Sequence, residues 1–145
     1  MKKLTITLLL VASGGWLLAS EEDDLTSLSY ISYLERYATV QPATQQEGIE
    51  AVINMPLVPG DRVDTAREAR MEVFLADGNT VWVDEYTTVS LDAVAFSRDG
   101  QADRTVLYLA EGTIMVEISD HRLSRQPIRV DVRAATVYLN DIGLY

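Results

Sequence analysis

The chain has no cysteine and almost no lysine or histidine. Without cysteine it forms no disulfide and carries no lipid-modified cysteine anchor, a composition that suits an oxidising compartment. Its only lysines are Lys2 and Lys3, and the formal net charge is −10. An acidic surface without lysine repels phosphates and anionic headgroups. We therefore expect neither nucleic acid nor an anionic membrane surface as a partner.

The single histidine, His121, lies in a polar stretch, and no G-x-S-x-G elbow or His/Cys metal spacing accompanies it. We interpret it as a solvated turn residue. Asp84, Glu85 and Asp92 are close enough in sequence to suggest the carboxylate pair of a glycoside hydrolase. A solvated acidic strand edge is the simpler interpretation, because the chain has 22 acidic residues. No catalytic residue, metal ligand or cofactor is predicted.

Residues 1–20 have the layout of a secretory signal peptide: two lysines, an apolar run, and then Ala19 and Ser20, where cleavage is predicted. Removing them takes away both lysines and none of the 22 acidic residues, so the net charge falls from −10 to −12. The alternative is an N-terminal membrane anchor, which needs about 18 apolar residues and reaches that length only if Trp16 and the glycines are counted. Residues 21–27 are predicted to be an acidic linker.

The rest of the chain shows short apolar alternations separated by Gly, Asp and Pro turns, with no sustained helical periodicity. This pattern predicts an all-β fold, either an antiparallel β-sandwich or roll of short strands or, as the alternative, a β-solenoid-like stack. Strands are expected over residues 30–40, 49–53, 69–75, 81–83, 87–91, 106–110, 113–118, 128–132 and 135–139, with a polar loop at 97–104. The strands at 106–110 and 113–118 are expected to pair around Glu111-Gly112.

The stretch from Asn54 to Leu91 carries most of the information. Pro56 and Pro59 each fix a φ angle and remove a backbone donor, so they exclude a helix interior or a central strand. Gly60 followed by Asp61 is typical of a turn. After this turn the alternation resumes and leads to a hairpin.

The register of that hairpin depends on the length of its Asp77-Gly78 loop. A two-residue loop would mix the apolar and polar faces, whereas a three-residue loop keeps them separate. The three-residue loop is therefore predicted, with Met71, Val73, Leu75, Val81 and Val83 on one face and Phe74 and Trp82 on the other.

Phe74, Trp82 and Met115 then face away from the core strip, and we take them as a candidate partner face. Aromatic residues and methionine are enriched in binding patches. Two interpretations remain open: the side chains pack under a neighbouring strand, loop or further segment, or they form an exposed docking site. If they are buried, the polar strand with Arg129, Asp131 and Arg133 is the next candidate surface.

The ordered pattern N-x-P-L-x-x-G-D-x-x-x-T, an alternating strand, D-G, V-x-V and L-x-L-x-x-G resembles the FecR domain of periplasmic iron-dicitrate-type regulators and secreted bacterial proteins. The resemblance spans residues 28–145. Relatives have glycine where this chain has Arg36, and a threonine-proline pair where it has Arg133-Ala134. The family-motif structural residues among the matching positions are Asn54, Pro56, Leu57, Gly60, Asp61, Thr65, Asp77, Gly78 and Gly112. The other matching positions are Val81, Val83, Leu107 and Leu109.

The resemblance implies a non-enzymatic regulatory or binding module of the bacterial envelope that acts through protein–protein or cell-wall contacts. The partner would be an envelope protein or a cell-wall component, and the location periplasmic or secreted, with membrane attachment only if the N-terminal segment is uncleaved. Because relatives continue the strand after Gly143, we expect the domain to be truncated at its C-terminus. The alternative function is a small secreted carbohydrate-active enzyme that uses acidic residues.

Overall fold

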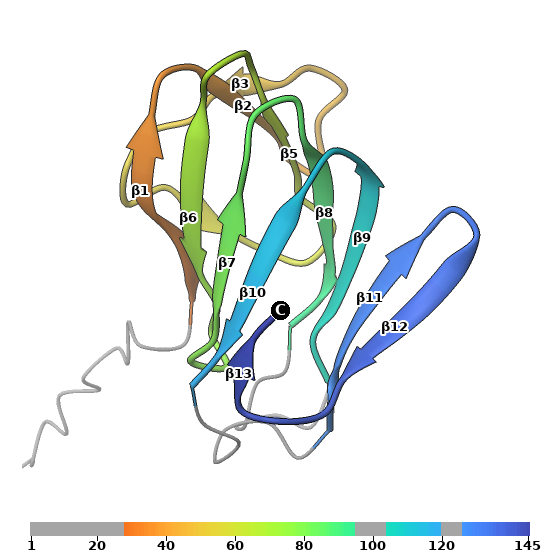
Figure 1. Ribbon diagram of the computed structural model, residues 1–145. Coiled ribbons are helices and arrows are strands. Elements are labelled where there is room, and N and C mark those ends of the chain that lie inside the picture. Colours follow the sequence, from red (N-terminus) through yellow and green to blue (C-terminus); the bar gives the residue numbers. More distant parts are fainter. Residues whose placement is uncertain (1–27, 95–103, 120–125) are drawn as a thin grey trace, which may run out of the picture.

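The computed structural model describes residues 28–94, 104–119 and 126–145, and within them it contains thirteen strands and no helix (Figure 1). The all-β fold class predicted from the sequence is confirmed. The strands are β1 Ser29–Glu35, β2 Ala38–Gln41, β3 Ile49–Glu50, β4 Pro56–Leu57, β5 Arg62–Thr65, β6 Arg70–Phe74, β7 Thr80–Val83, β8 Thr88–Ala93, β9 Val106–Glu111, β10 Ile114–Ile118, β11 Ile128–Val132, β12 Ala135–Leu139 and β13 Gly143–Leu144.

The strands form two sheets that pack face to face. Sheet A has the order β13-β10-β7-β6-β1-β4, and sheet B the order β12-β11-β9-β8-β5-β2-β3. The structure is therefore the β-sandwich that the sequence predicted first, and not the alternative β-solenoid-like stack. One pair departs from the antiparallel expectation, because β9 and β11 run parallel. The chain leaves sheet B after β9, runs back through sheet A as β10, and returns as β11 in the original direction.

Two sequence-based expectations are wrong because the chain passes from one sheet to the other where one strand or one hairpin was predicted. The expected single strand over residues 30–40 is wrong, because Arg36 has φ 65° and the chain turns there from β1 in sheet A to β2 in sheet B. The expected pairing of 106–110 with 113–118 is also wrong. Gly112, with φ 91°, forms the corner between β9 and β10, and a Cβ at this position would lie 2.7 Å from the Cβ of Thr87. At both of these places, where the chain changes sheet, a residue with positive φ makes the turn.

The hairpin formed by β6 and β7 has the predicted register. Met71 pairs with Val83 and Val73 with Val81, while the Leu75 N–H donates to the Asn79 carbonyl at 2.8 Å. Three residues, 76–78, therefore form the loop, and the prediction is confirmed. Gly78 has φ 84°, a backbone conformation that glycine adopts without steric strain.

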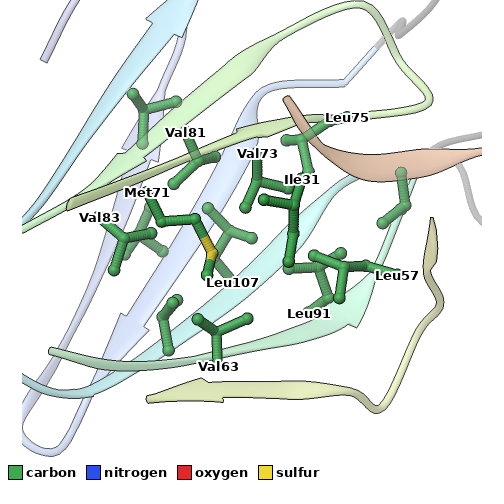
Figure 2. Close-up of a cluster of buried hydrophobic side chains, with 14 of the residues drawn as sticks. Ile31, Leu57, Val63, Met71, Val73, Leu75, Val81, Val83, Leu91 and Leu107 are labelled. Atoms are coloured by element: carbon green, nitrogen blue, oxygen red, sulfur yellow. The ribbon is translucent and has the colours of Figure 1, made fainter. Parts of the chain in front are cut away.

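The core lies between the sheets and draws on both (Figure 2). Sheet A contributes alternate residues of its central strands, and sheet B contributes side chains that face them across the gap of about 10 Å usual for packed sheets. Each fully buried aliphatic side chain contributes roughly 1.5–3 kcal/mol. Of the expected core residues of β9 and β10, Leu107, Val116 and Ile118 are buried, and Leu109 and Ile114 are half-buried. The best-buried side chains include Ile31, Leu57, Val63, Met71, Val73, Leu75, Val81, Leu91 and Leu107.

The β11–β12 hairpin extends beyond the body of the sandwich (Figure 1). Its base is buried at Ile128 and Leu139, whereas Val137, on the same side of β12 as Leu139, is 46% exposed. The hairpin therefore lacks a facing sheet over its outer half.

Several expectations concern residues outside the described ranges. These are the signal peptide or anchor at 1–20, the linker at 21–27, most of the polar loop at 97–104, and His121. In the part of the chain that the structure describes, no helix has the length and apolar character needed to cross a membrane.

Candidate functional site

The outer face of sheet A brings Trp82 and Met115 side by side. The two residues are direct cross-strand partners on β7 and β10. On the other side of Trp82 lies Glu72 of β6, and beyond it Tyr33 of β1. Val81 and Val83 on either side of Trp82 are buried, and so is Val116 beside Met115. Trp82 and Met115 therefore face outward, because neighbouring side chains of a strand point to opposite faces. The result is a row of four side chains across four strands.

This row forms the floor of a groove of about 790 Å³ on the outer face. Met115 is 38% and Tyr33 44% exposed, while Trp82 is half-buried. The size falls within the range typical of ligand pockets, roughly 300–1,000 Å³. We call this surface the sheet A groove; it is lined by Tyr33, Glu35, Arg70, Met71, Glu72, Trp82, Val83, Asp84, Thr113, Ile114 and Met115.

Phe74, the third residue of the candidate partner face, lies one row away from the groove. It pairs with Thr80, so it is diagonal to Trp82 on the same face. Its ring lies against that of Tyr30, with the centroids 5.5 Å apart, and it is half-buried. The structure therefore brings Trp82 and Met115 together and places Phe74 beside Tyr30, where an aromatic neighbour already covers part of it.

The groove has an acidic rim. Asp84 forms an ion pair with Arg70 at 3.5 Å, and the Tyr33 hydroxyl donates to Glu35 at 3.3 Å. The Ser32 hydroxyl donates to the Glu72 carboxylate at 2.5 Å, which fixes that carboxylate beside Trp82. Three carboxylates, those of Glu35, Glu72 and Asp84, and the single guanidinium of Arg70 thus line the groove. An apolar floor with an excess of negative charge fits a surface that has both apolar and basic groups.

The acidic residues considered for hydrolysis do not form a catalytic pair. Asp84 points outward from sheet A, whereas Asp92 follows the core-facing Leu91 and lies on the outer side of sheet B. The two are separated by both sheets, whose planes alone are about 10 Å apart, beyond the roughly 5–9.5 Å that glycosidases use. Glu85 accepts a hydrogen bond from the Glu68 N–H at 2.6 Å, which joins the turn after β5 to the turn after β7.

Asp92 has a different neighbourhood on sheet B. Burial raises the pKa of its carboxyl above the usual value, and the nearby negative charge of Asp131 raises it further, while Arg129 opposes the change. The pKa of Asp131 is lowered, first by the hydrogen bond from Thr136 and then by that from Arg129. Both carboxylates thus lie near Arg129 on the outer side of sheet B.

Arg129, Asp131 and Arg133 were the second candidate surface. Arg129 forms an ion pair with Asp131 at 2.7 Å along β11, and Arg133 lies exposed in the turn that follows. The structure therefore separates Arg133 from the other two.

The first group of family-motif residues builds the turn before β5. Asp61 is buried, and its carboxylate accepts hydrogen bonds from the Ala43 and Val58 N–H groups at 3.0 and 2.9 Å. Gly60 has φ 96°, and a Cβ there would lie 2.7 Å from the Cβ of Ala43. Asn54, with φ 65°, turns the chain toward Pro56 in β4, and Leu57 is buried in the core.

The second group joins the two sheets. The Thr65 hydroxyl donates to the Asp84 carbonyl at 2.6 Å and accepts from the Thr87 N–H at 2.9 Å. Asp77 is buried, accepts from the Asn79 N–H at 3.0 Å, and receives a hydrogen bond from the Thr105 hydroxyl. None of these motif residues except the strand residue Val83 lines the groove.

Tyr33 is the groove residue that sequence reasoning missed. It reaches the outer face because the pairing of β1 with β6 shifts between Ile31 and Tyr33, with Ser32 as the extra residue. Such a bulge interrupts the alternation. Simple alternation from the buried Ile31 would place Tyr33 in the core.

The geometry defines a two-sheet, all-β domain with a groove on the outside of sheet A. The model of the FecR protein family matches residues 61–141, more than half of the chain, and the chain belongs to this family. The family is a regulatory one associated with the bacterial envelope. Comparison with curated proteins and with solved structures found no match. The family match includes Trp82 and Met115 but begins after β1, which contributes Tyr33.

Proposed function

We propose that this protein is a non-enzymatic binding module of the bacterial envelope and that it contacts an envelope protein through the sheet A groove. The observation that carries this proposal is the pairing of Trp82 with Met115 on an outer face, in one row with the exposed Tyr33, which lies beyond Glu72. Membership of a regulatory family supports it. A cell-wall component is the other partner class consistent with the family.

The chemistry of the groove favours a protein partner. Aromatic residues and methionine are enriched at the centre of protein interfaces, and methionine adapts its shape to different surfaces. A lysine or arginine of the partner could lie over the face of Trp82 and approach the carboxylate of Glu72. This combination requires a partner surface with apolar groups and at least one basic side chain.

The alternative, a small secreted carbohydrate-active enzyme, has less support. Asp84 and Asp92 lie on opposite outer faces, and Asp84 already pairs with Arg70. Selective loss of a hydrolytic activity in Asp84→Asn, Glu85→Gln or Asp92→Asn, without unfolding, would favour the enzyme and overturn the binding module.

We further propose that residues 1–20 are a signal peptide removed on export, that residues 21–27 are a linker, and that the binding domain covers 28–145. Mass spectrometry of the protein purified from its native envelope tests the first point. A new N-terminus next to Ala19 or Ser20 is expected. A retained Met1 together with membrane fractionation would instead identify an anchor.

The groove can be tested by site-specific crosslinking in the native envelope. A photoreactive phenylalanine analogue at position 115 should form a crosslink to a defined protein, and Trp82→Ala should abolish it. The matched control carries the analogue at Val52, which is 54% exposed but outside the groove. The captured partner is then produced separately and its Kd is measured.

Trp82→Ala should weaken that Kd at least tenfold, and Met115→Ala should weaken it by less. Tyr86→Ala is the control, because Tyr86 is exposed in a turn and lies outside the groove. Circular dichroism checks that each variant remains folded. Equal affinity of the wild type and both groove variants would overturn the assignment of the groove.

A further inference from the structure

The four edges of the two sheets differ in length and composition. Among the described residues, sheet A ends in β4 and β13 and sheet B ends in β3, and each of these strands has two residues. β4 begins with Pro56 and β3 ends with Glu50. The fourth edge, β12, has five residues, ATVYL, without charge or proline. Natural proteins usually protect an edge strand with charge, proline or short length, because its free backbone groups pair with other strands. β12 has none of these protections.

The free backbone groups of β12 can be assigned from its neighbours. The Arg129 N–H donates to the Thr105 carbonyl, so Arg129 and Asp131 direct their backbone groups toward β9. By alternation, Val130 directs its groups toward β12, where it pairs with Val137. Thr136 and Tyr138 therefore turn their N–H and C=O groups toward the open side of β12.

The side chains on this strand are also accessible. Val137 and Tyr138 are 46% and 49% exposed. The β11–β12 hairpin extends away from the body of the sandwich (Figure 1), so another strand can approach the open side of β12 without meeting sheet A.

We propose that β12 is a self-association site at which a second copy of the chain adds its own β12 antiparallel to the first. With the two-fold axis at Val137, Thr136 faces Tyr138 of the second copy, and Tyr138 faces Thr136 of the second copy. The outward N–H and C=O groups of these residues form four hydrogen bonds, and the two Val137 side chains meet at the axis. The two sheets B then form one continuous sheet.

The charges around β12 favour a second copy over a basic partner. The chain carries a net charge of −10, and a basic partner would be attracted to its acidic regions. Among the described residues near the hairpin, however, Arg104, Arg129 and Arg133 balance Asp92, Asp131 and Asp141, and β12 itself is uncharged. Two copies can therefore meet here without opposing like charges. This site is separate from the sheet A groove and does not depend on the proposed function.

Sedimentation velocity of the full chain over a range of concentrations tests this proposal. The wild type should show a weak monomer–dimer equilibrium, because one added strand buries a small interface. Higher salt should strengthen the dimer, since it screens repulsion between the two acidic bodies. Val137→Lys should weaken dimerisation at least tenfold, because it places two positive charges at the axis. Val52→Lys, which changes an equally exposed valine in a loop, should have no effect.

A mixing experiment tests the two-fold register itself. Val137→Lys and Val137→Asp should each be monomeric alone, and their equimolar mixture should dimerise again, because opposite charges then meet at the axis. In addition, Val137→Cys should give a disulfide-linked dimer on mild oxidation, since directly opposed residues of a non-hydrogen-bonded pair lie about 4.5 Å apart at Cα. Val52→Cys should not.

Three results would overturn the proposal. A wild type that stays monomeric at the highest soluble concentration excludes self-association. A dimer that persists in Val137→Lys uses another surface. Failure of the mixed variants to dimerise, while the wild type does, excludes the register at Val137 and leaves a different partner strand as the occupant of β12.

Discussion

The β6–β7 and β11–β12 hairpins have similar sequence patterns and different environments. Both alternate apolar residues with polar ones, as in RMEVF with TVWV and IRVDV with ATVYL. In the first hairpin every core-facing side chain is buried, because strands flank it on both sides and sheet B covers it. In the second, Val137 faces the same way as Leu139 and remains exposed. Alternation therefore specifies which face a side chain occupies, whereas the surrounding strands determine whether that face is buried.

The largest expected difference comes from the same substitution in each hairpin. Val73→Ala should lower the free energy of unfolding by about 2–3 kcal/mol, since it removes buried methyl groups and leaves a cavity. Val137→Ala should lower it by less than about 0.5 kcal/mol, as expected for an exposed position. Urea denaturation at a concentration where the chain is monomeric measures both. Similar losses in the two variants would mean that the second hairpin is packed in solution.

A substitution in the turn of the first hairpin should likewise cost more stability than one in the turn of the second. Gly78→Ala should cost about 1–2 kcal/mol, because residue 78 has φ 84°. The turn of the second hairpin contains no residue with positive φ, so Ala134→Ser should change stability by less than about 0.5 kcal/mol. Denaturation midpoints of the two variants decide this, and an unchanged midpoint for Gly78→Ala would exclude the left-handed loop.

The first hairpin was predictable because its information is local. The Asp77-Gly78 pair and the separation of apolar from polar residues specified the loop length and directed Trp82 outward. The same reasoning directed Met115 outward, but it did not place Met115 beside Trp82, because that pairing joins strands far apart in sequence. Tyr33 was missed for another reason: the bulge at Ser32 interrupts the alternation on which the prediction depends.

The corners between the sheets were not predictable from alternation. At Arg36 and Gly112 the chain passes from one sheet to the other, and an apolar pattern continues on both sides because both sheets share one core. The glycine that relatives have at position 36 was the available signal, since it indicates a backbone conformation that glycine tolerates best. The left-handed φ of Arg36 agrees with that signal.

Arg36→Gly should therefore stabilise the protein slightly. Relief of left-handed strain is worth roughly 1–2 kcal/mol, and the greater freedom of glycine in the unfolded chain offsets about 0.4–1 kcal/mol of it. We expect a net gain below about 1 kcal/mol in urea denaturation. A loss of stability would mean that the exposed ion pair of Arg36 with Glu68 outweighs the strain.

The smallest effects concern Asp131 of the second hairpin and the neighbouring Asp92. The lowered pKa of Asp131 means that its contribution to stability is present above its ordinary value of 3.8 and is lost as the pH falls through the lowered pKa. The raised pKa of Asp92 means that its charged carboxylate has the opposite effect and lowers the stability of the fold. This loss of stability disappears as the pH falls through the raised pKa.

At pH 7, Asp131→Asn should accordingly lower the denaturation midpoint and Asp92→Asn should raise it. Both differences from the wild type should disappear once the pH is low enough to protonate the two carboxylates. Midpoints measured from pH 7 to pH 3 test this pair. Shifts of the same sign in the two variants would contradict the assignment.

The central claim is that the sheet A groove is covered by a partner in the native envelope. Hydroxyl-radical footprinting tests it directly, because methionine and tryptophan react readily when exposed. We predict that Met115 and Trp82 are oxidised more slowly in the native envelope than in the purified protein, while Tyr86, exposed and outside the groove, reacts equally in both. Equal oxidation of Met115 in the two samples would contradict the claim.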